Sequence, residues 1–374
     1  VAKAFGITMD KPEDSTLTVV GGSCIFGGGN SAANTFGDLA LLSGVFDASG
    51  VTNFMVSTYN DIWTNASAAV FKAPDLVDIR GYQCKLHANG LVFSNLSFGV
   101  TDGRLLLQAK TTNTVAGDLK ILYSGLADGT LAVKGDIYCL KTITGGYHAG
   151  GNGVVLANGD RDQTLYAATN GAMPTLVIDK PAGTALRTEG NILTFVAPGA
   201  GVAGGHLTLA SGHFTLPASN LVFESYGSQF VQKPGTTLDA GESTVFFNSW
   251  SPKLAFTDAE LHRVVINTPI SSGLPGNNLN IEAGTTATVA RALVQTRGLL
   301  NASAKGVLRL LGDLEIGERA SGGSAPLVFA GGNDQLYNNQ GTNVTLPELP
   351  HPARHDAASE VTAACAGCIR SGVS

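Results

Sequence analysis

The chain has 374 residues, of which 14% are charged, and its net charge is −6. An average soluble protein has about 25% charged residues. No Lys/Arg cluster exceeds two or three residues, so the electrostatic footprint of a nucleic-acid-binding protein is absent. No apolar run approaches the roughly 18 residues of a membrane-spanning helix, which excludes that class of protein. The chain begins with Val1 instead of Met, as a processed form or a fragment of a longer protein would.

The remaining composition is typical of short strands joined by tight turns. The sequence contains 48 glycines and is rich in Thr, Ser, Asn and Val. Because few charges are available, much of the surface must consist of uncharged polar side chains. Such a surface suits packing against identical neighbours or against sugars.

Strand-like phrases recur along the chain at intervals of about 80 to 90 residues. One phrase opens at Val70, Val155, Phe246 and Val328. A second phrase follows each of these and centres on Leu96, Leu176, Val264 and Leu349, which are 80, 88 and 85 residues apart. Regular self-similarity of β-type segments predicts a stacked repeat protein instead of a globule closed around a pocket.

The phrases divide the chain into blocks. We predict repeat blocks at 70–153, 154–243 and 244–326 and a partial block at 327–350. Residues 1–69 are interpreted as the tail of a first block and the N-terminal end of the solenoid, because 37–46 is a twin of 205–214. Residues 351–374 break the pattern and are predicted to form a C-terminal cap or a segment that joins a neighbouring subunit.

Within each phrase, apolar residues alternate with polar ones, as in Leu207-Thr208-Leu209. Alternate side chains of a strand point to opposite faces, and Gly with Asp or Asn supplies the corners between strands. The pattern predicts an all-β parallel solenoid, in which each strand pairs with the strand one coil below, about 4.8 Å away. The hairpin dipeptides Asn158-Gly159 and Asp128-Gly129 leave tandem β-sandwich domains as the alternative.

The strings at 205–212 and 174–180 resemble repeats of large bacterial surface and secreted proteins. Those proteins are pectin-lyase-like right-handed parallel β-helices, among them autotransporter passengers and giant repeat adhesins. The resemblance extends from about Thr16 to Leu349 and fails after Pro350. It implies a right-handed β-helix, an extracellular or cell-surface location, and a scaffold, adhesive or filament-forming role.

The five cysteines form no regular framework. Cys24, Cys84 and Cys139 lie in apolar strand-like contexts and are interpreted as small buried hydrophobic residues. Cys365 and Cys368 form a terminal CxxC, for which a local disulfide or two free thiols are the hypotheses.

The densest polar cluster is the turn at 158–162. Its carboxylates Asp160 and Asp162 are two residues apart, so they are candidate calcium ligands, although the EF-hand pattern is not met. A solvated turn is the competing interpretation. No other metal or cofactor is predicted. None of the seven histidines forms an HExxH or HxH pattern.

Glycoside hydrolysis needs two carboxyl groups about 5 to 9.5 Å apart. Five acidic residues stand out in the pattern, but they mostly occupy corners, where we expect them to accept backbone N–H bonds: Asp118, Asp136, Asp179, Glu189 and Asp313. Three aromatic residues are candidates for sugar stacking or, alternatively, for packing: Trp63, Tyr226 and Trp250.

The sequence therefore predicts an extracellular structural or adhesive β-helix protein without a catalytic centre. We expect it to self-associate as a homo-oligomer into a surface layer or filament. Cell-surface carbohydrate is the candidate external partner. The alternative function is a carbohydrate-active β-helix enzyme, either a polysaccharide lyase or a tailspike-like glycosidase.

Overall fold

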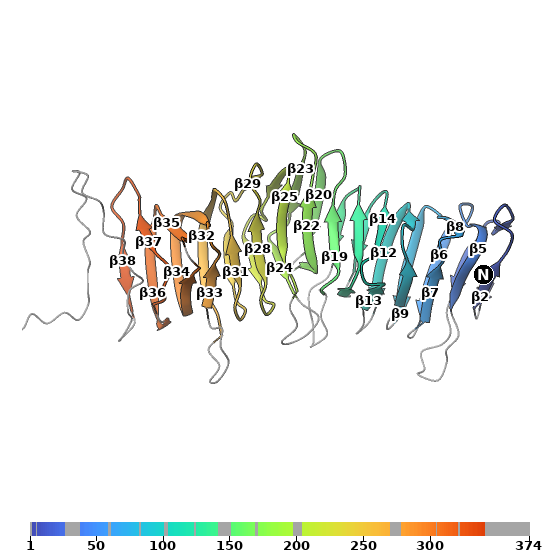
Figure 1. Ribbon diagram of the computed structural model, residues 1–374, viewed down its shortest axis with the longest axis horizontal. Coiled ribbons are helices and arrows are strands. Elements are labelled where there is room, and N and C mark those ends of the chain that lie inside the picture. Colours follow the sequence, from blue (N-terminus) through green and yellow to red (C-terminus); the bar gives the residue numbers. More distant parts are fainter. Residues whose placement is uncertain are drawn as a thin grey trace, which may run out of the picture.

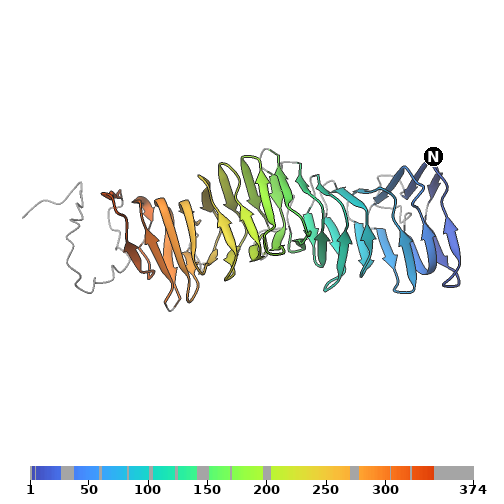
Figure 2. The same ribbon diagram turned by 90° about the horizontal axis from the view of Figure 1, so that it is seen from above.

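The computed structural model describes residues 2–4, 6–26, 38–58, 61–81, 84–100, 104–122, 125–140, 151–168, 171–196, 204–269, 278–303, 305–320 and 322–340. They form an elongated rod of stacked strands (Figure 1), which Figure 2 shows from above. All strand pairings among these residues are parallel. The predicted parallel β-solenoid is therefore confirmed. The alternative of β-sandwich domains is wrong, because sandwiches of that kind need antiparallel sheets.

Each coil of the rod crosses three faces, which we number by the order in which the chain meets them. The first face begins with an 11-stranded sheet: β1 (Ala2–Ala4), β4 (Ser23–Phe26), β6 (Asn53–Thr58), β9 (Leu76–Gly81), β12 (Asn95–Val100), β15 (Leu119–Ile121), β18 (Ile137–Cys139), β20 (Gln163–Ala167), β23 (Ala185–Glu189), β26 (His213–Thr215) and β29 (Thr237–Asp239). It continues with the starts of β32 (Ala259–Asn267) and β34 (Thr286–Ala302), and then with β35 (Val307–Leu310) and β37 (Leu327–Phe329).

The second and third faces are built in the same way. The second face holds β2 (Ile7–Asp10), the start of β5 (Leu39–Asp47), β7 (Asp61–Asn65), β10 (Cys84–Ala88), β13 (Arg104–Leu107), β16 (Gly125–Ala127), β21 (Gly171–Met173), β24 (Ile192–Phe195), β27 (Asn220–Phe223), β30 (Thr244–Phe247), the middle of β32 and β34, β36 (Asp313–Ala320) and β38 (Tyr337–Asn339). The third face holds β3 (Thr16–Thr18), the end of β5, β8 (Ala69–Lys72), β11 (Val92–Phe93), β14 (Thr112–Val115), β17 (Thr130–Val133), β19 (Val154–Ala157), β22 (Thr175–Asp179), β25 (Leu207–Ser211), β28 (Gln229–Gln232), β31 (Lys253–Ala255), β33 (Asn278–Ile281) and the end of β34.

One continuous hydrophobic core fills the centre of the rod. Alternation places Leu207 and Leu209 inside and leaves Thr208 partly exposed, as the sequence pattern predicts. Parallel register stacks like side chains on one another: Phe195 lies 5.3 Å from Phe223, which lies 5.3 Å from Phe247, measured between ring centroids. Because successive coils pair in register, similar side chains of neighbouring coils stack on one another in the core.

Many corners are four-residue turns in which the third residue has a positive φ. In the turn at 181–184, the N–H of Thr184 donates to the carbonyl of Pro181 at 3.1 Å, and Gly183 has a φ of 83°. The turn at 108–111 has the same hydrogen bond at 3.3 Å but places Lys110 at a φ of 63°. Glycine suits the third position because it carries no Cβ, whereas lysine is strained there.

Coil length varies along the rod. On the first face, Leu96 pairs with Leu119, Leu119 with Ile137, and Ile137 with Leu165, so these successive coils take 23, 18 and 28 residues. Leu96 lies in β12 on the first face, whereas Leu176 lies in β22 on the third. The interval of about 85 residues is therefore not a whole number of coils here. The block boundaries stay a prediction, and residues 351–374 lie outside the described part of the chain.

The predicted twins 37–46 and 205–214 have matching local structures. Gly44 and Gly212 have φ values of 79° and 81°, and a register shift precedes each of them, opposite Asp10 and Asp179. The twins do not lie on the same face, however. Strand β2, which pairs with β5, follows the first strand of the 11-stranded sheet and therefore lies in the first coil. Strand β22, which pairs with β25, follows the eighth strand of that sheet and therefore lies in the eighth coil. The motif therefore recurs seven coils later and one face further round the rod.

Candidate functional site

The turn at 158–162 is organised by a lysine that sequence reasoning did not single out. Lys180, at the end of β22, is only 1% exposed and reaches down into this turn of the preceding coil. Its Nζ donates to the carbonyl of Gly159 at 2.8 Å, to the side-chain Oε1 of Gln163 at 2.8 Å and to the carbonyl of Arg161 at 2.5 Å. Three oxygens therefore satisfy the three protons of one buried ammonium.

Gln163 completes the turn from below and is also 1% exposed. Its Oε1 accepts the N–H of Gly159 at 2.9 Å, and its amide donates to the carbonyl of Val133 at 3.1 Å and to that of Gly135. Burial lowers the pKa of Lys180 to about 8, against the opposing effect of the nearby carboxylates of Asp162 and Asp160. Lys180 and Gln163 therefore act as one polar link between two coils.

The two candidate calcium ligands lie at the exposed rim of this turn. Asp162 pairs with the guanidinium of Arg187 and accepts the N–H of Ala185 at 2.9 Å. The hydrogen bond from Arg187 is the main cause that holds the pKa of Asp162 below its ordinary value. In the described part of the chain, no three His, Cys, Asp or Glu side chains gather as a metal site would require. Calcium binding at Asp160 and Asp162 stays a prediction.

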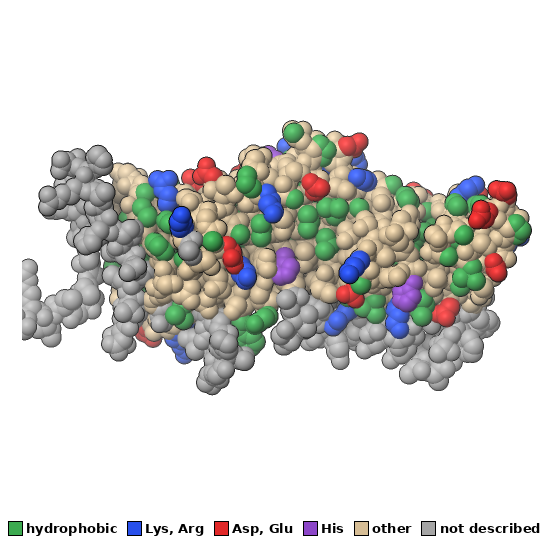
Figure 3. Space-filling model, in the orientation of Figure 1, with side chains coloured by type: hydrophobic (Ala, Val, Ile, Leu, Met, Phe, Trp, Pro, Cys, Tyr) green, Lys and Arg blue, Asp and Glu red, His purple; other side chains and the backbone are tan. Residues whose placement is uncertain are grey.

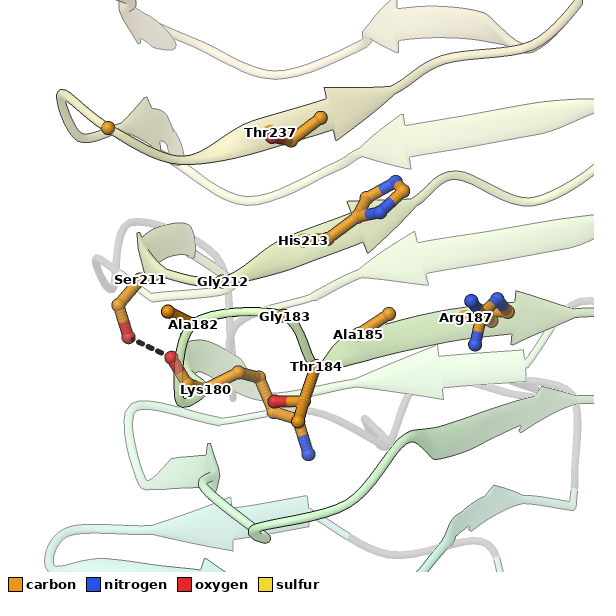
Figure 4. A pocket seen from close by; sticks show the side chains of 11 residues that line it. Lys180, Ala182, Gly183, Thr184, Ala185, Arg187, Ser211, Gly212, His213 and Thr237 are labelled. Carbon is orange, nitrogen blue, oxygen red and sulfur yellow. Dashed lines mark hydrogen bonds between the residues drawn. The ribbon is translucent and has the colours of Figure 1, made fainter.

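Beside this turn, a shallow depression of about 380 Å³ opens on the first face. Figure 4 shows Arg187, His213 and Thr237 projecting from β23, β26 and β29 along one side of it, and the Lys180–Ser211 hydrogen bond at its end. The register places His213 beside Ala185 on one strand and Thr237 on the next. The depression therefore offers a guanidinium, a hydroxyl and an imidazole whose Nε2 is buried and makes no hydrogen bond among the described residues. Groups of these kinds suit hydroxyl-rich or anionic ligands.

A second group on the same face is a stack of two tyrosines. The rings of Tyr138 and Tyr166 are 4.6 Å apart and inclined by 10°, and Lys120 Nζ lies 5.7 Å from the centroid of Tyr138. These three residues occupy the same register position on successive coils. Burial, followed by the charges of Asp118 and Asp136, raises the pKa of Tyr138. Because Tyr138 is covered by Lys120 and Tyr166, its ring is not a platform for a sugar.

The corner acids mostly bind backbone of the next coil. Asp118 Oδ1 accepts the N–H of Asp136 at 2.9 Å, and Asp136 Oδ1 accepts the N–H of Thr164 at 2.8 Å. Asp313 does the same for Leu336 at 2.9 Å. The expected corner role is confirmed for these three residues. Asp179 instead accepts the hydroxyl of Ser211 at 2.7 Å, and Glu189 lies exposed at the end of β23, in register with Tyr166.

The remaining candidates are spread along the rod. Trp63 is buried in the core, Trp250 donates its indole N–H to the carbonyl of Pro269 at 3.0 Å, and Tyr226 is 42% exposed. His206 and His213 lie on different faces, because the chain turns at Gly212 between them. Burial lowers the pKa of His206. Figure 3 shows charged side chains scattered over the viewed face.

Buried thiols are confirmed for three of the cysteines: Cys24, Cys84 and Cys139. Burial raises the pKa of the Cys139 thiol to about 12, so it is not a reactive thiolate near neutral pH. Three histidines and two cysteines lie outside the described residues: His148, His351, His355, Cys365 and Cys368.

One signal in the sequence points to the lysine corner that was missed. The tripeptide Asp-Lys-Pro occurs at 10–12 and again at 179–181, each time before a Ser-Gly pair that follows about 30 residues later, at 43–44 and 211–212. Tyr138 and Tyr166 follow similar glycine-containing turns, but only the coil length reveals that they are neighbours.

In the described residues, no helix is long and apolar enough to cross a membrane. The parallel β-solenoid implied by the resemblance is confirmed, whereas kinship with autotransporter passengers or adhesins stays a prediction. No known family model, no curated protein and no solved structure matches this chain.

Proposed function

We propose that this protein is an extracellular structural or adhesive solenoid that self-associates into a filament or a surface layer. The observation that carries this proposal is the use made of its polar side chains. Asp118, Asp136 and Asp313 cap backbone N–H groups of the next coil, and the Lys180 ammonium links two coils. Groups that a catalytic centre would direct at a substrate instead hold the rod together.

The surface composition supports the same role. With a net charge of only −6 on 374 residues, the rod has little net repulsion against copies of itself. An electron micrograph of the purified chain, with light scattering at several concentrations, tests the proposal. We expect filaments or ordered sheets whose thickness is that of the solenoid. Separate rods at every concentration would contradict self-association.

We propose cell-surface carbohydrate as the adhesive partner. The depression supports this choice, because Arg187, His213 and Thr237 offer donors to sugar hydroxyls or carboxylates on one face. Binding of labelled polysaccharides to the wild-type chain should be lost in a variant with both Arg187→Ala and His213→Ala. Equal binding by the two proteins would show that the sugar does not bind in the depression.

The same depression favours a second candidate function, a polysaccharide lyase or glycosidase. His213 and Arg187 are residue types that can move a proton and neutralise a sugar carboxylate. Incubation with a panel of neutral and acidic polysaccharides tests this function. Cleavage of a polysaccharide that depends on His213 would replace the scaffold proposal with an enzymatic one. An unchanged polysaccharide length would contradict the enzymatic function and leave the scaffold proposal standing.

A further inference from the structure

Two corner motifs each occur twice along the chain, once in each half. The first is the lysine corner, at 10–15 with 43–45 and at 179–184 with 211–213. Ser43 donates to Asp10 at 2.8 Å and to the Lys11 carbonyl at 2.5 Å. Ser211 donates to Asp179 and to the Lys180 carbonyl, both at 2.7 Å. Lys11 is therefore the equivalent of Lys180.

One backbone hydrogen bond of the lysine corner repeats as well, although Asp14 does not have the positive φ that Gly183 has at the equivalent position. The N–H of Ser15 donates to the Pro12 carbonyl at 2.8 Å, as Thr184 does to Pro181 at 3.1 Å. A Cβ at Gly44 would lie 2.9 Å from the Cβ of Lys11, and one at Gly212 would lie 2.5 Å from that of Lys180. Both glycines thus allow the same close approach to a lysine.

The second motif is the glutamine corner, at 159–163 and at 331–335. Gln335 Oε1 accepts the N–H of Gly331 at 3.3 Å, as Gln163 does that of Gly159 at 2.9 Å. The amide of Gln335 donates to the carbonyls of Leu310 and Gly312 at 3.0 and 2.7 Å, which matches the bonds of Gln163 to the carbonyls of Val133 and Gly135.

Both motifs recur by the same displacement. Gln163 opens β20, the eighth strand of the first face. On the first face, the eleventh strand β29 is followed by segments of β32, β34 and β35 and then by β37, which is thus the fifteenth strand. Gln335 follows β37 and therefore belongs to the fifteenth coil. Gln335 also lies one face further on than Gln163. The glutamine corner therefore moves by seven coils and one face, as the lysine corner does.

Within the chain, the lysine corner of the second half sits on the glutamine corner of the first half, and Lys180 with Gln163 forms the junction. The other two corners lie near opposite ends of the rod. Lys11 is in the first coil, and no hydrogen bond or ion pair of its ammonium occurs within the described residues. The oxygen of Gln335 accepts only Gly331 among those same residues, and Gly332, Asn333 and Asp334 are exposed.

We propose that copies of this chain associate head to tail by repeating this junction, with Lys11 of one copy inserted into the 331–335 corner of the next. The Lys11 ammonium would donate to the carbonyls of Gly331 and Asn333 and to Oε1 of Gln335. The contact is heterologous, so it continues the screw of the solenoid and generates a fibre. This inference rests on the proposed self-association and names its interface.

Two variants each block one end. Lys11→Met keeps the length of the side chain and removes its ammonium. Gly332→Arg adds a bulky cation where a Cβ would meet nothing within 4 Å, so it obstructs the glutamine corner without disturbing the fold. Lys72→Met removes a surface lysine of the third coil, which pairs with Asp47 of the second coil, and serves as the matched control. Circular dichroism and melting curves confirm that each variant is folded.

Analytical ultracentrifugation is the measurement. We expect wild type and Lys72→Met to form long assemblies, and each end variant alone to remain monomeric. An equimolar mixture of the two end variants should give a dimer that grows no further, because each contributes one intact end. Assemblies by the single variants, or a mixture without dimers, would overturn this interface and leave self-association standing. A monomeric wild type would overturn both proposals.

Discussion

The ammonium of Lys180 lies 2.8 Å from the side-chain oxygen of Gln163 and joins two coils at the corner that follows β22. Both side chains are buried, so the link is polar and shielded from water. Lys180→Met should lower the free energy of unfolding by about 1–3 kcal/mol near neutral pH, because buried oxygens lose their donor. Urea unfolding measures this loss. An unchanged midpoint would show that the link contributes no net stability.

The same lysine predicts a pH dependence. Its pKa is about 8 in the folded chain, whereas an ordinary exposed lysine has a pKa of 10.5. Between these pH values the unfolded chain holds the additional proton, so stability rises with pH across that window and is flat below it. The rise amounts to about 3 kcal/mol. Stability curves from pH 7 to 11 should differ in this way between wild type and Lys180→Met, and parallel curves would contradict the prediction.

Gly212 should tolerate alanine far less than Gly227 does. Both have positive φ values, 81° and 61°, which cost an L-residue about 1–2 kcal/mol. At Gly212 the new Cβ would also meet Lys180 Cβ at 2.5 Å, whereas at Gly227 it meets nothing within 4 Å. The urea midpoint of Gly227→Ala reports the cost of backbone strain alone, and that of Gly212→Ala reports the same strain plus the steric clash with Lys180. Equal losses would mean that the corner yields and the close approach is not needed.

Lys110 is a place where the natural residue is the strained one. It holds a φ of 63° in an exposed corner, the position that glycine occupies in the corner at 181–184. Lys110→Gly should raise stability by up to about 1 kcal/mol, because the relief of strain exceeds the extra chain entropy of glycine. Lys85→Gly, inside β10, is the control and should destabilise. A loss at both positions would contradict the account of the corner.

The solenoid architecture could be predicted from the sequence because the alternation of apolar and polar residues and the glycine corners are both set by neighbouring residues. Leu207-Thr208-Leu209 alone tells which side chains face the core. The candidate site depends on coil length instead, which varies between 18 and 30 residues on the first face. Without that length, Lys180 cannot be placed on the turn of Gly159, nor Tyr138 beside Tyr166. Corner motifs in polar, degenerate sequence carry little signal, which is why the Asp-Lys-Pro twins do not stand out.

The predicted calcium site competes with charges already in its turn. A calcium ion at Asp160 and Asp162 would replace Arg187 on Asp162 and lie near the Lys180 ammonium. We therefore expect calcium to raise the melting temperature more in Arg187→Ala than in wild type. Asp162→Asn in the Arg187→Ala background is the control and should abolish the rise. Melting curves that calcium and EDTA leave unchanged in both proteins would remove the calcium prediction.

The tyrosine stack should behave as a coupled pair. Tyr138 and Tyr166 are 4.6 Å apart and nearly parallel, which is the spacing between coils and leaves no room for another group between the rings. A double-mutant cycle with Tyr138→Ala and Tyr166→Ala should give a coupling energy of about 0.5–1.5 kcal/mol. Tyr226→Ala, at a tyrosine that is 42% exposed, should change stability little. Additive losses of unfolding free energy at Tyr138 and Tyr166 would show that the rings are neighbours without mutual stabilisation. The two rings would then be free for another role on the first face.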